Sequence, residues 1–222
     1  MVEVEKLRFS YPEGGYCLDI PELKLEGGRA TAIVGPSGCG KTTLLHLIAG
    51  IKRPGHGRIL VMNKELCSLS EADVRAFRVQ NIGLIFQEFE LLDYLNVLDN
   101  ILLPYRISRA LKLDGGVKQR AGALVDEVGL GDKLKRPVRQ LSQGERQRVA
   151  ICRALLAKPS LILADEPTGN LDVENTDKVL EILFKYVEES GATLVSVTHE
   201  RHLLDRFDRC VDFSTLLEGG KV

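Results

Sequence analysis

The sequence has no apolar run long enough to cross a membrane. Its best stretch, Leu44 to Ile51, is short and includes His46, whereas a spanning helix needs about 20 predominantly apolar residues. The start of the chain, Met1 to Lys6, alternates charged and apolar residues and lacks the continuous core of a signal peptide. We therefore expect a protein that stays in the cytoplasm and whose membrane partner, if it has one, is a separate chain.

Cysteines are few and dispersed, and tracts rich in proline or serine are missing. The five cysteines are odd in number and form no C-x-x-C pair, which argues against a disulfide framework and a structural zinc site. With 44% hydrophobic and 27% charged residues, the composition is that of a globular protein rather than a disordered one. At 222 residues, the chain is long enough for one domain or one domain with an insertion.

Neither sign of charge dominates. Thirty basic and 31 acidic residues give a net charge of −1, so the sequence lacks the electrostatic footprint of a protein that binds DNA or an anionic membrane surface. We predict no nucleic-acid partner.

Apolar periodicity predicts antiparallel strands first and parallel strands later. Residues 2–9 and 18–25 alternate with a period near two on either side of a Gly14-Gly15 turn. Short apolar runs at 30–34, 57–62, 82–86, 161–164 and 192–198 are typical of further strands. A repeat of three and four residues, carried by Val179, Leu180, Leu183, Tyr186 and Val187, predicts a crossover helix between the last two runs and therefore parallel pairing.

The middle of the chain has a helical period. Between about Glu88 and Pro159 the apolar residues repeat at helical spacing, for example from Val117 to Val128 before Gly129. We predict a single α/β domain over 1–222, in which 1–87 and 160–222 form the core and 88–159 form an inserted helical subdomain.

A phosphate-binding pattern, G-x-x-x-x-G-K-[ST], lies between a predicted strand and a predicted helix, which is the context that this loop requires. Its glycines let successive backbone N–H groups surround phosphate oxygens, and the helix dipole adds to the attraction. We expect Lys41 to reach the β and γ phosphates and Thr42 to coordinate Mg²⁺. The nucleotide-binding residues predicted here are Gly35, Pro36, Ser37, Gly38, Cys39, Gly40, Lys41, Thr42 and Thr43.

Cys39 lies within this loop. Neighbouring N–H groups and Lys41 would lower the pKa of its thiol, so we predict a reactive, accessible thiolate that MgATP protects from alkylation. The alternative is a small, buried and inert thiol.

The strand at 161–164 ends in two carboxylates, Asp165 and Glu166. Ligands of open α/β sheets bind at such strand ends. Asp165 is suited to Mg²⁺ through water, and Glu166 is suited to act as the general base on an attacking water. A solvated pair in a loop is the alternative, which the upstream phosphate-binding loop disfavours.

Ser142-Gln143-Gly144-Glu145 opens a predicted helix that runs to about Leu156. Ser142 and Glu145 have the spacing of a capping box. The same turn offers N–H groups and a hydroxyl to an anion, so it can also bind a phosphate.

Residues 141–150 (LSQGERQRVA), with the phosphate-binding loop and Asp165-Glu166, resemble the signature of ATP-binding cassette (ABC) ATPases, the nucleotide-binding subunits of ABC transporters. The resemblance extends over essentially the whole chain, because further family motifs follow in order at Tyr11, Gln87, Asn170-Leu171-Asp172 and His199. It implies an α/β P-loop NTPase fold with a mainly parallel sheet, an N-terminal antiparallel β subdomain and a helical subdomain that carries the signature.

The resemblance also implies roles for single residues. Tyr11 would stack on adenine, although it could instead pack on the sheet while another aromatic residue, such as Phe9, stacks on adenine. Gln87 would contact Mg²⁺ and sense a membrane partner, where the residues alone indicate only a strand cap. His199 would contact the γ-phosphate, although a histidine at a strand end is usually a surface residue.

In the family, the signature of one subunit faces the phosphate-binding loop of the other. The resemblance therefore implies a nucleotide-sandwich dimer of two copies around two MgATP, in which Ser142, Gln143, Gly144 and Glu145 contact the partner's nucleotide. Asp172 would lie near the seam between subunits, or could equally be the N-cap of a helix that begins near Val173. Gln143 and Asn170 stand where glycine and serine are commoner in the family, and neither change removes a catalytic group.

Residues 86–88, 96–104 and 164–172 are similar to the branch that serves lipoprotein release, macrolide-type efflux and cell-division regulation. This implies ATP hydrolysis that drives an integral membrane permease, placing the chain on the inner face of the cell membrane. We expect docking near 87–104, in a groove along 88–95 with apolar anchors and an acidic rim, unless those residues are simply buried.

Two other functions remain open. The same ATPase could drive a mechanotransmission complex that regulates an extracytoplasmic enzyme and transports nothing. A soluble ABC ATPase of DNA repair or translation is disfavoured, because the chain has one cassette, no sustained heptads and no net basic charge.

Overall fold

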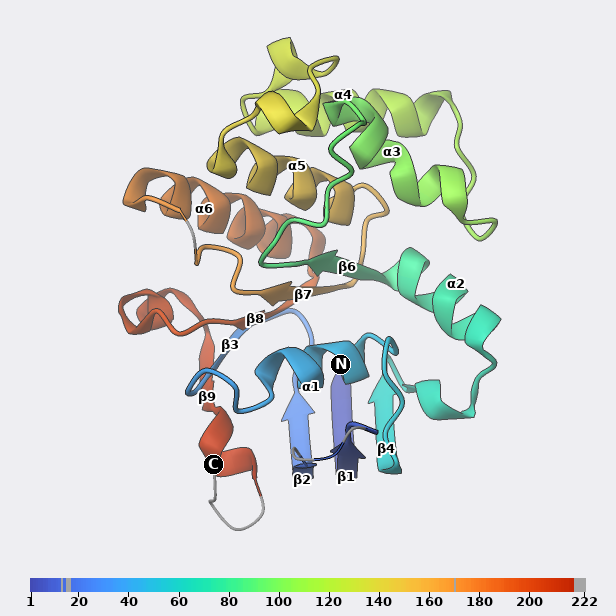
Figure 1. Cartoon of the computed structure of the whole chain (residues 1–222), viewed down its shortest axis with the longest axis vertical. Helices are drawn as coiled ribbons and strands as arrows, with labels where there is room; N and C mark the ends of the chain where they lie inside the picture. Colours follow the sequence, from blue (N-terminus) through green and yellow to red (C-terminus); the bar gives the residue numbers. More distant parts are fainter. Residues whose placement is uncertain (13, 15–16, 170, 218–222) are drawn as a thin grey trace.

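The computed structural model describes residues 1–12, 14, 17–169 and 171–217. They form two sheets and six α-helices, joined by short 3₁₀ turns (Figure 1). The strands are β1 (Val2–Ser10), β2 (Cys17–Leu25), β3 (Ala30–Val34), β4 (His56–Val61), β5 (Lys64–Glu65), β6 (Ile82–Ile85), β7 (Leu161–Asp165), β8 (Thr193–Val197) and β9 (Arg209–Asp212). The helices are α1 (Lys41–Ile48), α2 (Glu71–Asn81), α3 (Val97–Ile107), α4 (Gly115–Glu127), α5 (Gln143–Leu155) and α6 (Val173–Ser190).

The first sheet is antiparallel, with the order β2-β1-β4-β5. The buried side chains of β1 shift from even positions, Val2 and Val4, to odd positions, Leu7 and Phe9. The shift occurs at a β-bulge between residues 5 and 8, where Lys6 has a φ of 48°. A Cβ at Gly57 on the facing strand would lie 2.2 Å from the carbonyl oxygen of Lys6, so the bulge requires glycine there.

The second sheet is parallel, with the order β6-β7-β8-β3-β9, and it is buried on both faces. Leu161 and Leu163 of β7 face the core that includes α1 and the antiparallel sheet. Ile162 and Ala164, which point the other way, pack in the core that includes α5 and α6. Figure 1 shows the resulting layers, with α1 between the two sheets and α5 and α6 across the parallel sheet.

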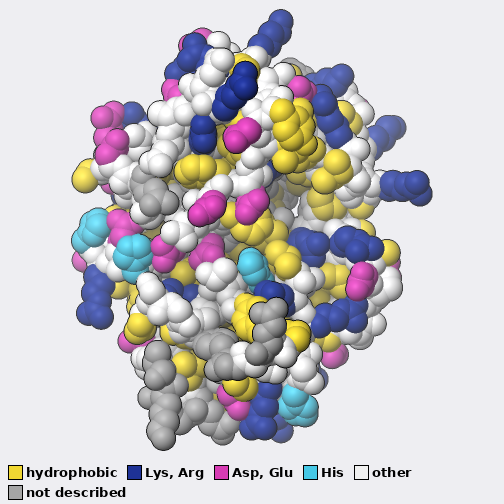
Figure 2. All heavy atoms as spheres, in the orientation of Figure 1, with side chains coloured by type: hydrophobic (Ala, Val, Ile, Leu, Met, Phe, Trp, Pro, Cys, Tyr) yellow, Lys and Arg dark blue, Asp and Glu magenta, His cyan; other side chains and the backbone are white. Residues whose placement is uncertain are grey.

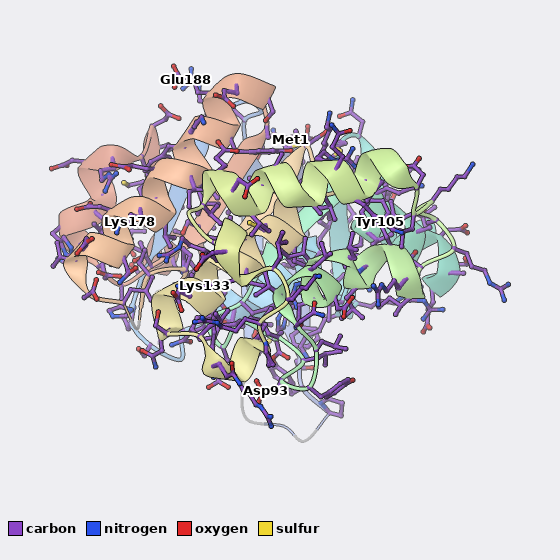
Figure 3. All side chains as sticks on the ribbon, turned by 90° about the horizontal axis from the view of Figure 1, so that it is seen from above. Met1, Asp93, Tyr105, Lys133, Lys178 and Glu188 are labelled. Atoms are coloured by element: carbon purple, nitrogen blue, oxygen red, sulfur yellow. The ribbon has the colours of Figure 1, made fainter. Side chains whose placement is uncertain are left out.

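Helices α3, α4 and α5 share a third core of their own. Asn100 is fully buried within this part, and its amide bonds the backbone of residues 92, 95 and 96, which ties the segment before α3 to the helix. Figure 3 looks down on this part, with Tyr105 of α3 and Lys178 of α6 on opposite sides. The predicted α/β arrangement of an antiparallel sheet, a parallel sheet and a helical part is present, whereas the domain boundaries at 88 and 159 stay a prediction.

Three elements were not predicted from the sequence, namely the two-residue strand β5, helix α2 and strand β9. Only Val74 and Phe77 of α2 are buried, and only Val211 of β9 is buried. Their apolar periodicity is therefore weak, and it is tertiary packing that holds them. β9 pairs with β3, so it completes the edge of the parallel sheet next to the strand that leads into the phosphate-binding loop.

None of the helices in the described part of the chain has the length and hydropathy of a membrane span.

Candidate functional site

The loop 35–42 connects β3 to α1 and surrounds the side chain of Lys41. Gly38 and Gly40 have φ values of 77° and 104°, which side chains other than glycine rarely adopt. The buried ammonium of Lys41 donates to the carbonyl oxygens of Gly35 at 2.8 Å and Pro36 at 2.7 Å. These bonds hold the loop in a closed ring around one positive charge.

Helix α1 begins without a side-chain cap. Within the described residues, α2 to α6 are each preceded by a side chain that accepts a backbone N–H of the helix, whereas α1 is preceded by Gly40, which has no side chain. The first backbone N–H groups of a helix need acceptors from outside the helix. Together with the dipole and Lys41, this makes the start of α1 suited to a phosphate.

Cys39 belongs to the same loop, but its side chain points into the protein. It is 2% exposed, and its Sγ lies 3.8 Å from Nζ of Lys41. The prediction of an accessible thiol is therefore wrong, because the residue packs in the core with α1 instead of facing the nucleotide.

Thr42 and Asp165 are brought together as expected for a magnesium site. Burial raises the pKa of Asp165 above its ordinary value, the side-chain hydrogen bond with Thr42 works against that rise, and the neighbouring charge of Glu166 adds to it. One hydroxyl and one carboxylate are hard oxygen donors, which suit Mg²⁺. No group of three His, Cys, Asp or Glu side chains able to hold a metal occurs in residues 1–12, 14, 17–169 and 171–217.

Glu166 follows β7 directly and has an unusual backbone conformation. Its φ is 45°, and its N–H donates to the carbonyl oxygen of Val197 on β8 at 2.9 Å. Its Oε1 lies 3.1 Å from Nδ1 of His199. A left-handed conformation in a non-glycine residue is costly and occurs where the surrounding structure enforces it, often at functional sites.

A cleft of about 370 Å³ brings these groups together. Its lining consists of Tyr11, Ser37, Gly38, Gly40, Lys41, Thr42, Thr43, Gln87 and Glu166. Gln87 is exposed two residues after the end of β6, and the His199 side chain is half-exposed beside Glu166. Predicted site residues from four separate parts of the sequence thus converge on one opening, whereas Gly35, Pro36, Cys39 and Asp165 do not line it.

Tyr11 both packs on the sheet and borders the cleft. Its ring meets that of Phe9 edge to face at 5.0 Å, and its hydroxyl is hydrogen-bonded to Oγ1 of Thr43 at 3.0 Å. Nζ of Lys52 lies 4.7 Å from the ring centroid. Lys52 was not predicted, since nothing in the sequence indicates that it reaches Tyr11. Adenine stacking by Tyr11 stays a prediction. Adenine would have to stack on the face of the ring that Lys52 does not cover, or the Lys52 side chain would have to move away.

The signature turn forms the predicted capping box. The N–H of Ser142 donates to Oε2 of Glu145 at 2.9 Å, and the N–H of Glu145 donates to Oγ of Ser142 at 3.3 Å. Burial alone would raise the pKa of Glu145, but hydrogen bonds from Lys133 and from the Ser142 N–H outweigh it and lower the pKa. None of residues 142–145 lines the cleft as described above, so a single chain does not bring its signature to its own phosphate-binding loop.

Asp172 caps α6, as one of its two predicted interpretations states. Its Oδ1 accepts the backbone N–H of Asn175 at 2.8 Å, and hydrogen bonds from Asn175 lower the pKa of this carboxyl group. Asn170 lies outside the described residues. A role for Asp172 at a seam between subunits stays a prediction.

Three contacts near the site were missed because they join residues far apart in the sequence. Thr168 donates to Oε1 of Glu200 at 2.6 Å, which links the loop after Glu166 to the segment after His199. Two further bonds start from α5, one from Gln147 to Pro167 in the segment after β7 and one from Arg148 to Asn175 of α6.

A second, larger cleft of about 630 Å³ lies beside β6, between α2 and α3. Its apolar lining includes Phe86, Leu103, Pro104 and Ile107, and Ile107 is 75% exposed. Its charged lining is Arg75, Arg78, Glu90, Arg109 and Arg153. Figure 2 shows basic side chains over α2 next to hydrophobic side chains of α3. The rim of this cleft is therefore mainly basic, because α2 and α5 contribute arginines that the sequence did not bring together. The acidic rim expected along 88–95, where Glu88, Glu90 and Asp93 are exposed, stays a prediction.

The segment 88–95 borders this second cleft only through Glu90. Phe89 and Leu92 are half-buried and do not contribute to its lining. Arg153 of α5 donates to the carbonyl oxygens of Phe89, at 2.6 Å, and Glu90. These bonds hold the turn after Gln87, in which both residues have positive φ.

Comparison with known proteins gives concordant results. Residues 18–169 match the family described as "ABC transporter". The chain is 42% identical over 188 residues to the lipoprotein-releasing system ATP-binding protein LolD of Hydrogenovibrio crunogenus, covering 85% of this chain and 81% of that one. It is 43% identical over 225 residues to the methionine import ATP-binding protein MetN 2 of Yersinia pestis, covering 100% of this chain and 67% of that one. The dimeric post-hydrolysis structure of the ATP-binding cassette MJ0796 bound to ADP and Pi is similar with a TM-score of 0.87, at 32% identity over 100% of this chain and 96% of that one.

Proposed function

The chain belongs to the ABC transporter family, and from that premise we propose that it is the MgATP-hydrolysing subunit of a lipoprotein-release or export system, working as a dimer on a separate membrane protein. The observation that carries the proposal is the cleft that unites Lys41, Thr42 and Glu166. ATP hydrolysis uses each of these groups in a distinct way.

Binding of the triphosphate is the task of the loop 35–42. Uncapped N–H groups at the start of α1 and the ammonium of Lys41 neutralise the phosphate charge. Thr42 and Asp165, with Gln87 at the edge of the cleft, would hold Mg²⁺, which neutralises charge that builds up on the phosphates when bound.

Proton transfer is the task of Glu166. Its carboxylate borders the cleft, and the imidazole of His199 lies 3.1 Å from Oε1. The carboxylate would orient the attacking water and accept its proton, while His199 fixes the carboxylate and faces the γ-phosphate.

A second copy of the chain would complete each site. The signature turn lies outside its own cleft, and its N–H groups are suited to the γ-phosphate of a facing subunit. A two-fold axis then gives two equivalent sites. The dimeric cassette with ADP and Pi that this chain resembles supports the arrangement.

The membrane partner would dock in the cleft between α2 and α3. Phe86 lines this cleft and is followed by Gln87, which lines the nucleotide cleft, so one short segment can relay dimer closure to the docked chain. Apolar lining with an arginine rim favours a partner helix that is apolar with carboxylates at its border. Such docking would place the protein at the cytoplasmic face of the membrane.

The type of system follows from relatedness to LolD, over most of both chains. Similarity to a methionine importer of comparable identity makes the cargo the decisive measurement. We would isolate the complex from native membranes, reconstitute it in liposomes, and measure ATP-dependent release of a fluorescent lipoprotein. Release that stops in Glu166→Gln complexes is expected. Uptake of a small solute would instead identify the complex as an importer. A partner that transports nothing and activates an extracytoplasmic enzyme would identify it as a mechanotransmission complex, and either result would contradict the proposal.

The docking position has its own test. In a Cys17→Ser, Cys210→Ser background, which removes the two exposed cysteines, Ile107→Cys should crosslink to the membrane chain. Glu188→Cys, at an exposed position of α6 on the other side of the view in Figure 3, is the control and should not crosslink. Crosslinks from the control position alone would place the partner elsewhere.

A further inference from the structure

The start of α5 and the start of α6 approach each other closely at Gly144 and Asn175. A Cβ at Gly144 would lie 2.5 Å from Oδ1 and 2.6 Å from Cγ of Asn175. Gly144 is buried inside α5 and is not one of the described glycines with positive φ. Its backbone conformation therefore does not require glycine, whereas the space that Asn175 occupies leaves no room for a side chain.

Both ends of the Asn175 amide are engaged. Oδ1 accepts from Nη1 of Arg148 on α5 at 2.8 Å. Nδ2 donates to both carboxylate oxygens of Asp172, each at 2.9 Å. The acceptor thus faces α5 and the donor faces Asp172, so one side chain joins the signature helix to the segment that precedes α6.

A second bond supports the same junction from Gln147, which lies about one helical turn after Gly144 in α5. Gln147 is 1% exposed, and its Nε2 donates to the carbonyl oxygen of Pro167 at 2.7 Å. Pro167 directly follows Glu166. Helix α5 is thereby bonded to Pro167 directly and to Asp172 through Asn175, on either side of the connection between β7 and α6.

We propose that Asn175 is a positioning residue that holds the signature turn 142–145 and Asp172 in one fixed arrangement, so that a subunit presents both together to the ATP bound by its partner. This inference rests on the proposed dimer. Asn175 touches no reacting atom and acts only through Gly144, Arg148 and Asp172. It also assigns Gly144 a second requirement, close packing within its own subunit.

The test is rescue of one variant by another in the full chain. Gly144→Ala should lower kcat for ATP by about 100-fold, because the added methyl group displaces Asn175 and with it the signature turn. Asn175→Ala alone should lower kcat by about tenfold and leave KM for ATP within about twofold, since the binding loop belongs to another part of the subunit. In the double variant Asn175→Ala makes room for the methyl group, so kcat should rise to the level of Asn175→Ala.

Alanine is a better helix former than glycine, so the double variant should not lose helix stability. Glu174→Ala is the matched control, because Glu174 is exposed, pairs with Lys178 and is adjacent to Asn175 in sequence. It should leave kcat unchanged. Loss of kcat in this control as large as in Asn175→Ala would overturn the proposal, and so would a double variant no more active than Gly144→Ala, since Gly144 would then be required at the phosphate alone.

A second pair of variants covers the possibility that truncation disturbs folding. Asn175→Asp places a carboxylate against that of Asp172 and should lower kcat. In the double variant Asn175→Asp, Asp172→Asn, the amide at position 172 can donate to the carboxylate at position 175, so kcat should recover. No recovery would overturn the proposal. ATP-dependent dimerisation of Glu166→Gln, followed by size-exclusion chromatography, reports separately on the dimer itself, so failure of the proposed function and failure of the Asn175 inference give different results.

Discussion

Oε1 of Glu166 lies 3.1 Å from Nδ1 of His199, and the two residues follow the neighbouring parallel strands β7 and β8. Parallel pairing brings the carboxyl ends of these strands to the same edge of the sheet, although 33 positions separate the residues in the sequence. The sheet therefore builds the candidate base and its partner without any local motif that contains both.

Glu166→Gln should bind ATP and hydrolyse it at least about 100-fold more slowly. The amide keeps the shape of the side chain but cannot accept a proton from water. The bound, unhydrolysed nucleotide should also trap a dimer in MgATP. Steady-state phosphate release and size-exclusion chromatography measure the two effects. Hydrolysis near the wild-type rate without an ATP-dependent dimer would show that Glu166 is not the base.

Lys41→Ala and Ser142→Arg should fail at different steps. The first removes the ammonium from the phosphate-binding loop and should weaken nucleotide binding by the monomer. The second adds bulk and charge at the turn that lies outside its own cleft, so binding should persist while hydrolysis fails. Ser142→Ala, which loses the cap at a cost of about 1 kcal/mol but adds no bulk or charge, controls for the stability of the turn. Equal loss of binding in Lys41→Ala and Ser142→Arg, by equilibrium titration, would place Ser142 in the cleft of its own subunit.

Cysteine alkylation should follow exposure and spare the phosphate-binding loop. Cys17 and Cys210 are exposed and should react in the native protein, whereas Cys39 and Cys152 are buried and should react only after unfolding. Burial raises the pKa of the Cys152 thiol to about 12, which further lowers its reactivity. Peptide mapping by mass spectrometry before and after denaturation measures each site. Rapid native labelling of Cys39 that MgATP prevents would contradict the buried position.

Local patterns predicted the parts of the fold that short segments determine. The loop 35–42 carries its own geometry, and Ser142 and Glu145 form their capping box within four residues. Helix α2 and strand β9 were missed because one or two buried side chains give no readable period. The junction of Gly144 with Asn175, and the arginines contributed by α2 and α5 to one cleft, depend on how helices pack. No sequence pattern encodes such packing directly.

The pair Lys133–Glu145 should make the signature turn sensitive to acid. The pKa of Glu145 is lowered from its ordinary 4.5, so the stability that it contributes is present above about pH 4.5 and is lost as pH falls through the lower native value. The Tm difference between wild type and Lys133→Met should therefore be largest near pH 7 and shrink toward pH 3. Lys133→Arg keeps the charge and should follow wild type. A Tm difference that does not change with pH would show that Lys133 stabilises the turn by packing alone.

Ile107→Asp should separate ATP hydrolysis from its membrane partner. Ile107 is 75% exposed at the border of the cleft between α2 and α3 and does not line the nucleotide cleft. A carboxylate there removes an apolar anchor and opposes the carboxylates expected on the docked helix, so binding of the partner should weaken about tenfold. Basal ATPase activity of the isolated subunit should stay within about twofold of wild type.

The control is Leu92→Ala, a half-buried position outside this cleft, which should leave partner binding unchanged. Co-purification from detergent-solubilised membranes and phosphate release measure the two properties. Full partner binding by Ile107→Asp, with loss in Leu92→Ala, would return the docking surface to the segment 88–95.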